Sequence, residues 1–219
     1  MIMYVINFIP HIPMVNVKVG VIVFPGSNCD RDMYHVLTDV FNLSAQYFWH
    51  EKRLPKNIDA VVLPGGFSYG DRLRAGIIAA HSPIISDVKK LAKKGIPILG
   101  VCNGFQILVE SGLLPGVLLK NDSLNFMCKW TNLIVKNITT PLTNKLKLNQ
   151  KIPIPIANGE GRYFVDEHIS KKLKSKNQIV FSYENYVNAS MEQIAGVCNE
   201  DGNVVGMMPH PERAAEKRN

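Results

Sequence analysis

The first half of the chain alternates between short apolar runs and longer segments with helical periodicity. Val17–Phe24 is a β-branched run that ends at Pro25 and Gly26, as expected of a strand buried on both faces of a parallel sheet. Further strands are predicted at 45–49, 59–63 and 96–99, and helices at 30–41, 84–94 and 103–111. Strands that alternate with helices predict an α/β fold with a doubly wound, mostly parallel sheet and flanking helices.

The second half of the chain is richer in short strands, predicted at 131–135, 152–156, 179–183, 194–198 and 204–208. Pro153 and Pro155 cannot donate to a ladder, which favours either a sheet edge or an irregular stretch for their segment. We find no repeat and no linker, so residues 17–219 are predicted to form a single domain. Residues 1–16 form an apolar extension that two prolines interrupt and that is too short to span a bilayer.

Composition narrows the class of protein. The net charge is +7 over 219 residues, but the basic residues are scattered, which favours a solvated surface over a nucleic-acid site. The four cysteines contain no Cys-x-x-Cys, so neither a disulfide framework nor a zinc site is indicated. We therefore expect a cytoplasmic protein without a nucleic-acid or membrane partner.

The first candidate for chemistry is Cys102, between Gly100 and Gly104, where a predicted strand meets a predicted helix. This is the context of a nucleophile elbow with Cys in place of Ser. The turn places the sulfur at a helix N-terminus, where backbone amides favour a thiolate. The alternative for a single cysteine is a small buried hydrophobic residue, which is how we interpret Cys128 and Cys198. Cys29, with no histidine near it in the sequence, is interpreted as structural.

A thiolate that attacks a carbonyl group needs a base and hydrogen-bond donors for the oxyanion. His210 precedes a proline, which favours an extended backbone, and in an extended segment Glu212 would lie on the same side. Glu212 could then fix the tautomer of His210 and stabilise the imidazolium. The segment could equally be an ordinary proline-rich turn.

A second glycine-rich loop, with Gly65 and Gly66, follows the predicted strand 59–63. Its backbone amides could supply one oxyanion donor and the amide of Asn103 the other. A phosphate-binding loop is the rival interpretation. However, no glycine in the chain is followed by lysine, and no G-x-G-x-x-G follows the first strand, which counts against nucleotide sites.

These segments resemble the class I (triad) glutamine amidotransferases, whose domain is flavodoxin-like, and among them the glutaminase subunits of phosphoribosylformylglycinamidine synthase. The resemblance runs from about residue 17 to residue 214. It is carried by GVCNGFQ at 100–106, PHPER at 209–213, FPGSNCDRD at 24–32, PGGFSYGD at 64–71, LRAG at 73–76, GLLPG at 112–116, GEGRY at 159–163 and GNVVGMMPHPERA at 202–214.

The resemblance implies that Cys102 attacks the carboxamide of glutamine, His210 protonates the departing ammonia and Glu212 orients His210. It further implies that Gly65, Gly66, Asn103 and Gln106 bind the substrate or its oxyanion. No cofactor or metal is expected in this chain. ATP and magnesium would bind a large synthetase subunit, which uses the ammonia to convert formylglycinamide ribonucleotide to the amidine in purine synthesis, and a small third subunit would bridge the two.

The chain also departs from the family, which usually has His where Asn158 precedes Gly-Glu-Gly-Arg, and a loop richer in proline and glycine than 186–190. Two alternative functions stay open at this point. One is a cysteine peptidase-like hydrolase on the same fold, although such relatives commonly take their His from directly after the Cys, where this chain has Asn103. The other is a non-catalytic regulatory module.

Overall fold

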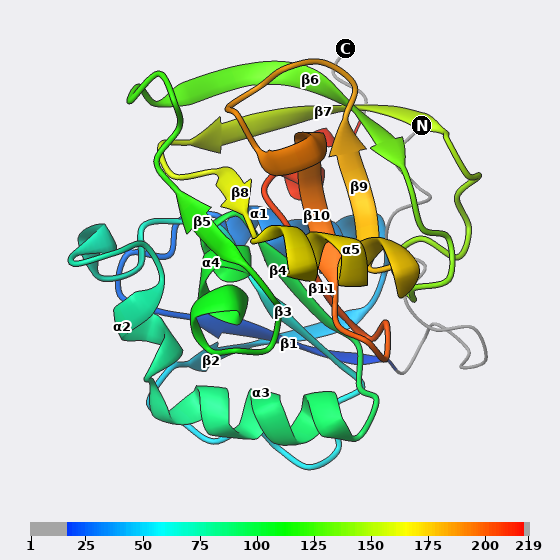
Figure 1. The fold of residues 1–219 in the computed structure, drawn as a ribbon. Helices are drawn as coiled ribbons and strands as arrows, with labels where there is room; N and C mark the ends of the chain where they lie inside the picture. The colour runs from blue at the N-terminus through cyan, green and yellow to red at the C-terminus, as the bar shows by residue number, and fades with distance from the viewer. Residues whose placement is uncertain (1–16, 217–219) are drawn as a thin grey trace.

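The computed structural model describes residues 17–216, and these form a large central sheet with helices on both faces (Figure 1). The predicted extension, residues 1–16, lies outside the described residues. The nine strands lie in the order β2 (Ser44–Trp49), β1 (Lys18–Val23), β3 (Ala60–Leu63), β4 (Ile98–Val101), β11 (Val204–Met207), β10 (Ile194–Cys198), β9 (Ile179–Tyr183), β6 (Met127–Val135) and β7 (Lys151–Asn158).

The sheet divides into a parallel and an antiparallel part. The strands from β2 to β11 pair in parallel, and those from β11 to β7 pair antiparallel. A separate two-stranded sheet joins β5 (Val117–Leu119) to β8 (Arg162–Phe164). The predicted α/β sheet is therefore confirmed, and the strand-rich second half of the sequence supplies its antiparallel part.

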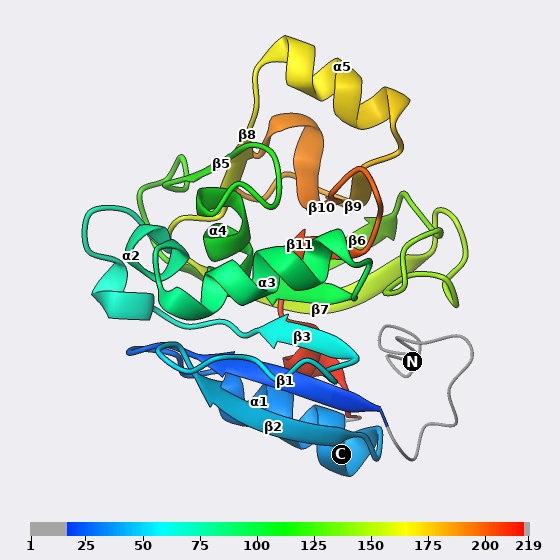
Figure 2. The ribbon, with the colours of Figure 1, turned by 90° about the horizontal axis from the view of Figure 1, so that it is seen from below.

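Helices cover the parallel strands from both sides. Figure 2 shows α1 (Asp30–His35) on one side of these strands and α3 (Pro83–Lys93) with α4 (Asn103–Glu110) on the other. The remaining helices are α2 (Ile77–Ala80) and α5 (Glu167–Ser175), and a π-helical turn at Val36–Val40 continues α1. Short 3-10 turns lie at Ser68–Asp71, Met191–Gln193 and Pro211–Ala214.

Burial explains why the apolar runs form the central strands. All residues of β3, β4, β10 and β11 are buried, because helices or neighbouring strands cover both of their faces. In the edge strand β2, by contrast, every residue is exposed or half-buried. The buried apolar side chains of the described residues form one continuous core cluster, which fixes the loops that follow the strands.

The proline-containing strand β7 lies at the sheet edge, as predicted. Pro153 and Pro155 face Asn132 and Trp130 of β6. The carbonyl oxygen of Pro155 accepts a hydrogen bond from the backbone N–H of His210 at 2.9 Å. The edge therefore holds the segment that carries the predicted catalytic histidine.

Several sequence predictions need correction. β4 begins two residues later than the predicted strand 96–99, and β6 begins four residues before the predicted 131–135. The pattern of the sequence did not predict α2, α5, β5 or β8. Cys128 is exposed and is not a core residue, because the first part of β6 pairs with β7 but not with β9.

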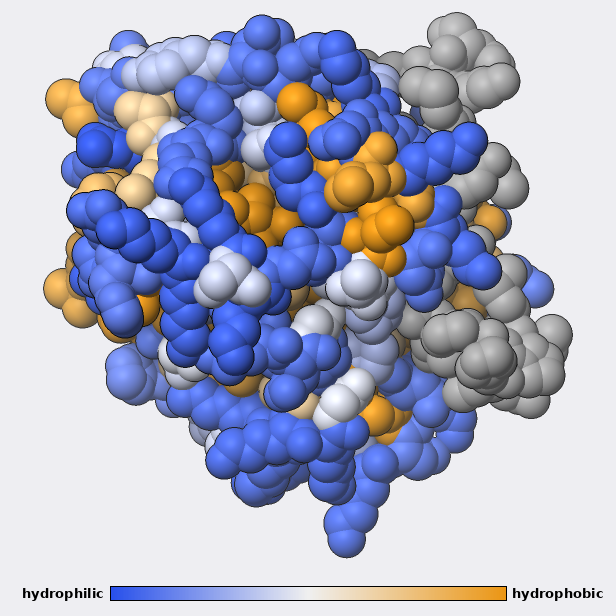
Figure 3. Space-filling view, turned by 45° about the vertical axis from the view of Figure 1, so that its right-hand side comes forward, coloured by the Kyte–Doolittle hydropathy of each residue, from blue (hydrophilic) through white to orange (hydrophobic). Residues whose placement is uncertain are grey.

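The surface carries both polar and apolar side chains. On the face that Figure 3 shows, hydrophilic side chains separate several apolar patches. Among residues 17–216, every helix is too short or too polar to cross a lipid bilayer.

Candidate active site

The turn between β4 and α4 has the geometry of a nucleophile elbow. Cys102 occupies it with φ 50° and ψ −108°, a strained backbone conformation that typically persists at functional sites. The N–H of Cys102 donates to the carbonyl of Met207 at 2.8 Å, which fixes the turn to the end of β11. The Cys102 sulfur lies 3.6 Å from the carbonyl oxygen of Ala157 in β7.

The two glycines beside Cys102 allow this turn to pack. A Cβ atom at Gly100 would lie 2.7 Å from the backbone of Gly104, and one at Gly104 would overlap the carbonyl of Leu63 in β3. Neither position can hold a larger side chain unless the backbone moves. Glycine at both positions is therefore needed for the close packing of the elbow.

His210 and Glu212 form a buried pair. His210 Nδ1 and Glu212 Oε1 lie 2.6 Å apart, and both side chains are almost completely buried. The predicted contact between His210 and Glu212 is present, but the extended backbone that was predicted to cause it is present only at His210. His210 is near-extended, whereas Pro211–Ala214 is a 3-10 turn, so the turn and not strand alternation brings Glu212 back to the imidazole.

Gly65 marks the place where His210 approaches Cys102. A Cβ atom at Gly65 would lie 2.9 Å from His210 Cε1, 3.1 Å from Cys29 Sγ and 3.4 Å from Cys102 Cβ. The imidazole from the end of the chain and the thiol from the elbow therefore meet beside this glycine. Within residues 17–216, His210 Nε2 and Glu212 Oε2 are buried without a hydrogen-bond partner, which is unusual for buried polar atoms.

The charges at this site favour a protonated histidine. Burial by itself would lower the pKa of His210, but the neighbouring charges of Cys102 and Glu212 and the contact with Cys29 raise that pKa well above its ordinary value. A thiolate beside an imidazolium is the form in which a cysteine attacks a carbonyl carbon. The arrangement is thus suited to nucleophilic catalysis.

The predicted oxyanion residues lie around the same sulfur. Gly66 lines a cleft of about 250 Å³ together with Cys102 and Gln106. Asn103 is the first residue of α4, so the helix leaves its backbone N–H without an acceptor. The Asn103 side chain accepts from the N–H of Ser68 at 3.1 Å and donates to Gln106 Oε1 at 2.9 Å. It thereby joins the elbow to the glycine-rich loop.

Two residues at the site were missed by sequence reasoning. The sulfur of Cys29 lies 4.0 Å from His210 Nδ1 and accepts a hydrogen bond from Arg213 Nη2 at 3.0 Å, so the structure places a histidine beside the thiol that was interpreted as structural. Asp71 also lines the cleft. Their place in the sequence was the signal that could have found them. Both residues follow predicted strands, and the carboxyl ends of parallel strands meet at one edge of the sheet.

One group of side chains among the described residues could hold a metal ion, because its ligand atoms lie within 4.8 Å of one another. The group consists of Cys29, His210 and Glu212. The Arg213 guanidinium on the Cys29 sulfur places a positive charge beside that position, which disfavours a cation. The geometry is better suited to proton transfer than to metal binding.

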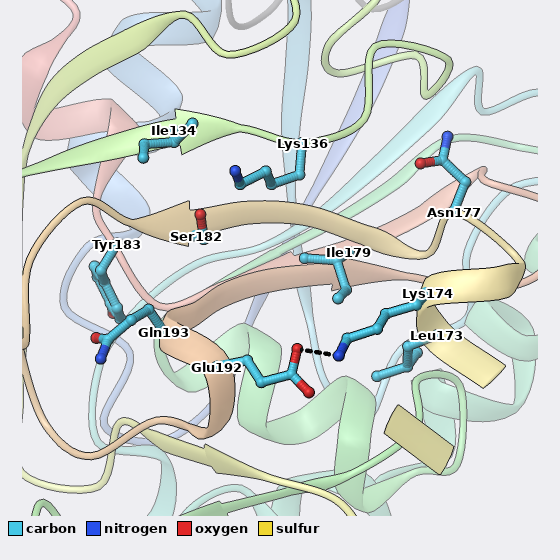
Figure 4. Close-up of a pocket in the computed structure, with 10 residues that line it drawn as sticks. All are labelled: Ile134, Lys136, Leu173, Lys174, Asn177, Ile179, Ser182, Tyr183, Glu192 and Gln193. Atoms are coloured by element: carbon cyan, nitrogen blue, oxygen red, sulfur yellow. Dashed lines mark ion pairs between the residues drawn. The ribbon is translucent and has the colours of Figure 1, made fainter. Parts of the chain in front are cut away.

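A larger pocket among the described residues has a separate lining. A pocket of about 460 Å³ between α5, β9 and β6 contains the ion pair of Lys174 with Glu192 at 2.7 Å (Figure 4). Its lining includes no cysteine or histidine, and therefore the smaller cleft at Cys102 is the candidate active site.

Comparison with known proteins shows the family of the chain. The model of the CobB/CobQ-like glutamine amidotransferase domain matches residues 16–219. The chain belongs to the glutamine amidotransferase family. The amidotransferase is also 48% identical to a chain in the structure of PurLQS from Thermotoga maritima, with a TM-score of 0.84, and the match covers 92% of this chain and 90% of that one.

Two more distant structures share the fold of this amidotransferase. A glutamine amidotransferase from Thermotoga maritima is 19% identical with a TM-score of 0.59, and the match covers 90% of this chain and 76% of that one. A putative GMP synthase subunit from Thermoplasma acidophilum is 16% identical with a TM-score of 0.55, at 92% and 86% coverage. At these identities the likeness shows the fold alone.

Proposed function

We propose that this chain is the glutaminase subunit of phosphoribosylformylglycinamidine synthase, a carbon–nitrogen ligase of purine synthesis. The observation that carries this proposal is the 48% identity to the PurLQS chain over nearly the full length of both chains. The pairing of His210 with Glu212 next to Cys102, which lines the cleft, supports it independently. The subunit hydrolyses glutamine to glutamate and ammonia and passes the ammonia to a synthetase.

The residues of the cleft can carry out this hydrolysis in two steps. The Cys102 thiolate attacks the side-chain carboxamide carbon of glutamine, and the N–H groups of Gly66 and Asn103 stabilise the oxyanion. The carbon–nitrogen bond then breaks as His210 gives its proton to the leaving ammonia, which leaves a γ-glutamyl thioester on Cys102. His210 next takes a proton from water, whose oxygen attacks the thioester and releases glutamate and the thiolate.

Glu212 acts on this reaction through His210. Its carboxylate accepts the Nδ1 proton of the imidazole at 2.6 Å, so Nε2 is the nitrogen left to exchange protons with substrate and water. This assignment fits the unpartnered state of His210 Nε2 among the described residues.

The alternatives are less well supported. A peptidase-like hydrolase would share the elbow, but the family match and the 48% identity favour an amidotransferase. A regulatory module without activity would not need the strained Cys102 backbone or the buried His210–Glu212 pair, both of which cost folding free energy.

The ammonia acceptor lies in a partner. A large synthetase subunit would bind ATP and magnesium and activate formylglycinamide ribonucleotide, and a small subunit would bridge it to this chain. The free thiol of Cys102, which the reaction needs in the reduced state, supports a cytoplasmic location.

The test compares two nitrogen sources in the reconstituted complex. We expect Cys102→Ala to lower glutamine-dependent amidine synthesis by at least about 1,000-fold and to leave ammonia-dependent synthesis within about twofold of the unmodified complex. Cys128→Ser, which changes an exposed thiol, serves as the control and keeps both activities. Loss of both activities in Cys102→Ala would contradict the division of labour between the subunits.

A further inference from the structure

The turn that carries Glu212 also carries an arginine that takes no part in the bond-making steps. Arg213 lies in the 3-10 turn Pro211–Ala214, directly after Glu212. Its Nη2 donates a hydrogen bond to the Cys29 sulfur at 3.0 Å, and its Nε lies 3.8 Å from Glu212 Oε1. The same oxygen of Glu212 lies 2.6 Å from His210 Nδ1. One guanidinium group therefore lies beside both a buried thiol and the carboxylate that holds the catalytic imidazole.

Cys29 provides a fixed anchor for this guanidinium group. Only 2% of the residue is exposed, and its backbone N–H donates to the carbonyl of Gly65 at 3.2 Å. A Cβ atom at Gly65 would lie 3.1 Å from the Cys29 sulfur and 2.9 Å from His210 Cε1, so the sulfur and the imidazole pack on the same glycine. The hydrogen bond from Arg213 thus joins the turn near the C-terminus to the loop that follows β1.

Arg213 combines contact with buried groups and contact with water. Its side chain keeps 36% of its surface exposed, whereas the Glu212 side chain is completely buried. A cation that stays partly hydrated avoids most of the cost of burying a charge, and a guanidinium group keeps its proton. Although burial by itself would lower the pKa of Arg213, the hydrogen bond to Cys29 and the charges of Cys29, Glu212 and Cys102 raise it. The positive charge of Arg213 is therefore permanent.

Glu212 needs a counter-charge that persists through the reaction. While His210 is protonated, the imidazolium balances the Glu212 carboxylate at 2.6 Å. When His210 gives its Nε2 proton to the departing ammonia, the imidazole becomes neutral, and a buried carboxylate without a counter-charge is costly. Within residues 17–216, Glu212 Oε2 has no hydrogen-bond partner, so hydrogen bonds to that oxygen do not offset this cost. Arg213 is a cation whose charge is the same before and after the proton transfer.

We propose that Arg213, held in place by the Cys29 sulfur, is a positioning residue for the catalytic pair. Its positive charge keeps the Glu212 carboxylate ionised and directed at His210 Nδ1 while His210 protonates the leaving ammonia. This inference rests on the proposed function and adds two residues to it, since Arg213 acts through Glu212 and Cys29 acts through Arg213. In this arrangement Cys29 is an anchor and not a second nucleophile.

A permanent cation beside the pair also makes His210 a better proton donor. Glu212 stabilises the imidazolium, whereas a nearby positive charge disfavours it. The other titratable groups that face His210 are Cys102 from the elbow and Cys29 from the loop after β1. Burial, and then the Cys102 charge, raise the pKa of Tyr183 at the end of β9, so this neighbour of the thiol stays neutral. Because these groups are unchanged in a variant of the arginine, the pH profile of that variant reports the guanidinium charge.

The first test measures ammonia release from glutamine by the reconstituted complex that carries Arg213→Gln. We expect kcat to fall by about 10- to 100-fold and KM to stay within about threefold, because proton transfer is affected and substrate binding is not. The alkaline limb of the kcat/KM profile should move to higher pH by at least about 0.5 pH unit, since the imidazolium loses a neighbouring positive charge. Arg213→Lys keeps the charge and should leave the limb within about 0.2 pH unit of its original position.

The second test determines whether Cys29 acts through Arg213. Cys29→Ala removes the sulfur acceptor and should lower kcat by at least about fivefold, whereas Cys29→Ser supplies a hydroxyl oxygen that also accepts and should keep kcat within about twofold. In Cys29→Ala/Arg213→Gln we expect no loss beyond that of Arg213→Gln alone, because both changes break the same contact. Arg31→Gln, which removes an exposed guanidinium group from α1, is the control and changes neither kcat nor the pH profile.

Each part of the proposal can fail separately. An alkaline limb that stays in place or moves to lower pH in Arg213→Gln would overturn the charge role of Arg213, and additive losses in the double variant would overturn the anchoring role of Cys29. Ammonia-dependent synthesis within about twofold of the unmodified complex shows that a variant has folded and assembled. If Arg213→Gln does not assemble, equal kcat values for Cys29→Ala and Cys29→Ser would overturn the proposal. Absence of ammonia release from glutamine by the unmodified complex would instead contradict the proposed function.

Discussion

At the scale of single residues, the protonation of one side chain in the site depends on the charges of its neighbours. His210 is buried next to Glu212 and close to both Cys102 and Cys29, so its protonation depends on all of them. Cys29 is the least expected member. Because Arg213 donates to the Cys29 sulfur, that thiol links the loop after β1 to the turn that follows His210.

The contribution of Glu212 can be measured from the pH profile. The pKa of His210 is raised in the folded protein partly by the Glu212 charge, so the imidazolium persists to higher pH than in a free histidine. In Glu212→Gln we expect kcat/KM for glutamine to fall by about 10²- to 10⁴-fold and the alkaline limb of its pH profile to move to lower pH. An unchanged profile would mean that Glu212 has no charge effect on His210.

At the scale of elements, α4 and β3 lie so close together that a residue larger than Gly104 does not fit between them. Gly104, in the first turn of α4, packs directly on the carbonyl of Leu63 in β3. This close approach sets the angle at which α4 leaves the elbow and therefore the position of Cys102 and the Asn103 amide.

We expect Gly104→Ala to destabilise the protein by about 3 kcal/mol, because the added methyl group meets backbone that cannot rotate away. Glutaminase activity should fall with it, since α4 must move from β3. Gly159→Ala is the control, because a Cβ there would contact only Phe126, at 3.7 Å, and its melting temperature should change by less than about 2 °C. Equal melting temperatures for both variants would show that α4 shifts without cost.

At the scale of the whole molecule, the partly buried carboxyl group of Asp71 lowers the free energy of unfolding at neutral pH. Burial and Glu160 raise the pKa of Asp71 to about 6, whereas an unfolded aspartate titrates near about 4. Between these values the folded protein binds more protons than the unfolded chain, so stability falls as pH rises from about 4 to about 6. Above that range the charged carboxylate costs on the order of 1 kcal/mol, allowing for solvent screening of a half-exposed group.

Asp71→Asn should therefore raise the melting temperature of the free chain by about 2–4 °C at pH 7.5, and by less at pH 4.5, where the aspartate is already protonated. Thermal unfolding followed by circular dichroism at the two pH values measures this difference. A lower melting temperature at pH 7.5 would mean that Asp71 has a stabilising partner.

The sequence by itself determined the parallel half of the sheet, the elbow and the residue types of the site. Apolar, β-branched runs such as Val17–Phe24 favour strands that are buried on both faces of a sheet, and glycines on both sides of Cys102 favour one kind of turn. Because these are local consequences of side-chain size and polarity, they could be predicted without coordinates. The antiparallel strands β9 and β10 were predicted for the same reason.

Only the tertiary structure decided which side chains meet. Cys29 and His210 are separated by 181 positions in the chain, and no local pattern encodes their distance. Asp71, Asn158 and Glu160 likewise line one cleft because the loop after β3 and the end of β7 come together. Such contacts depend on strand order and on packing between distant segments, which the alternation of apolar and polar residues does not specify.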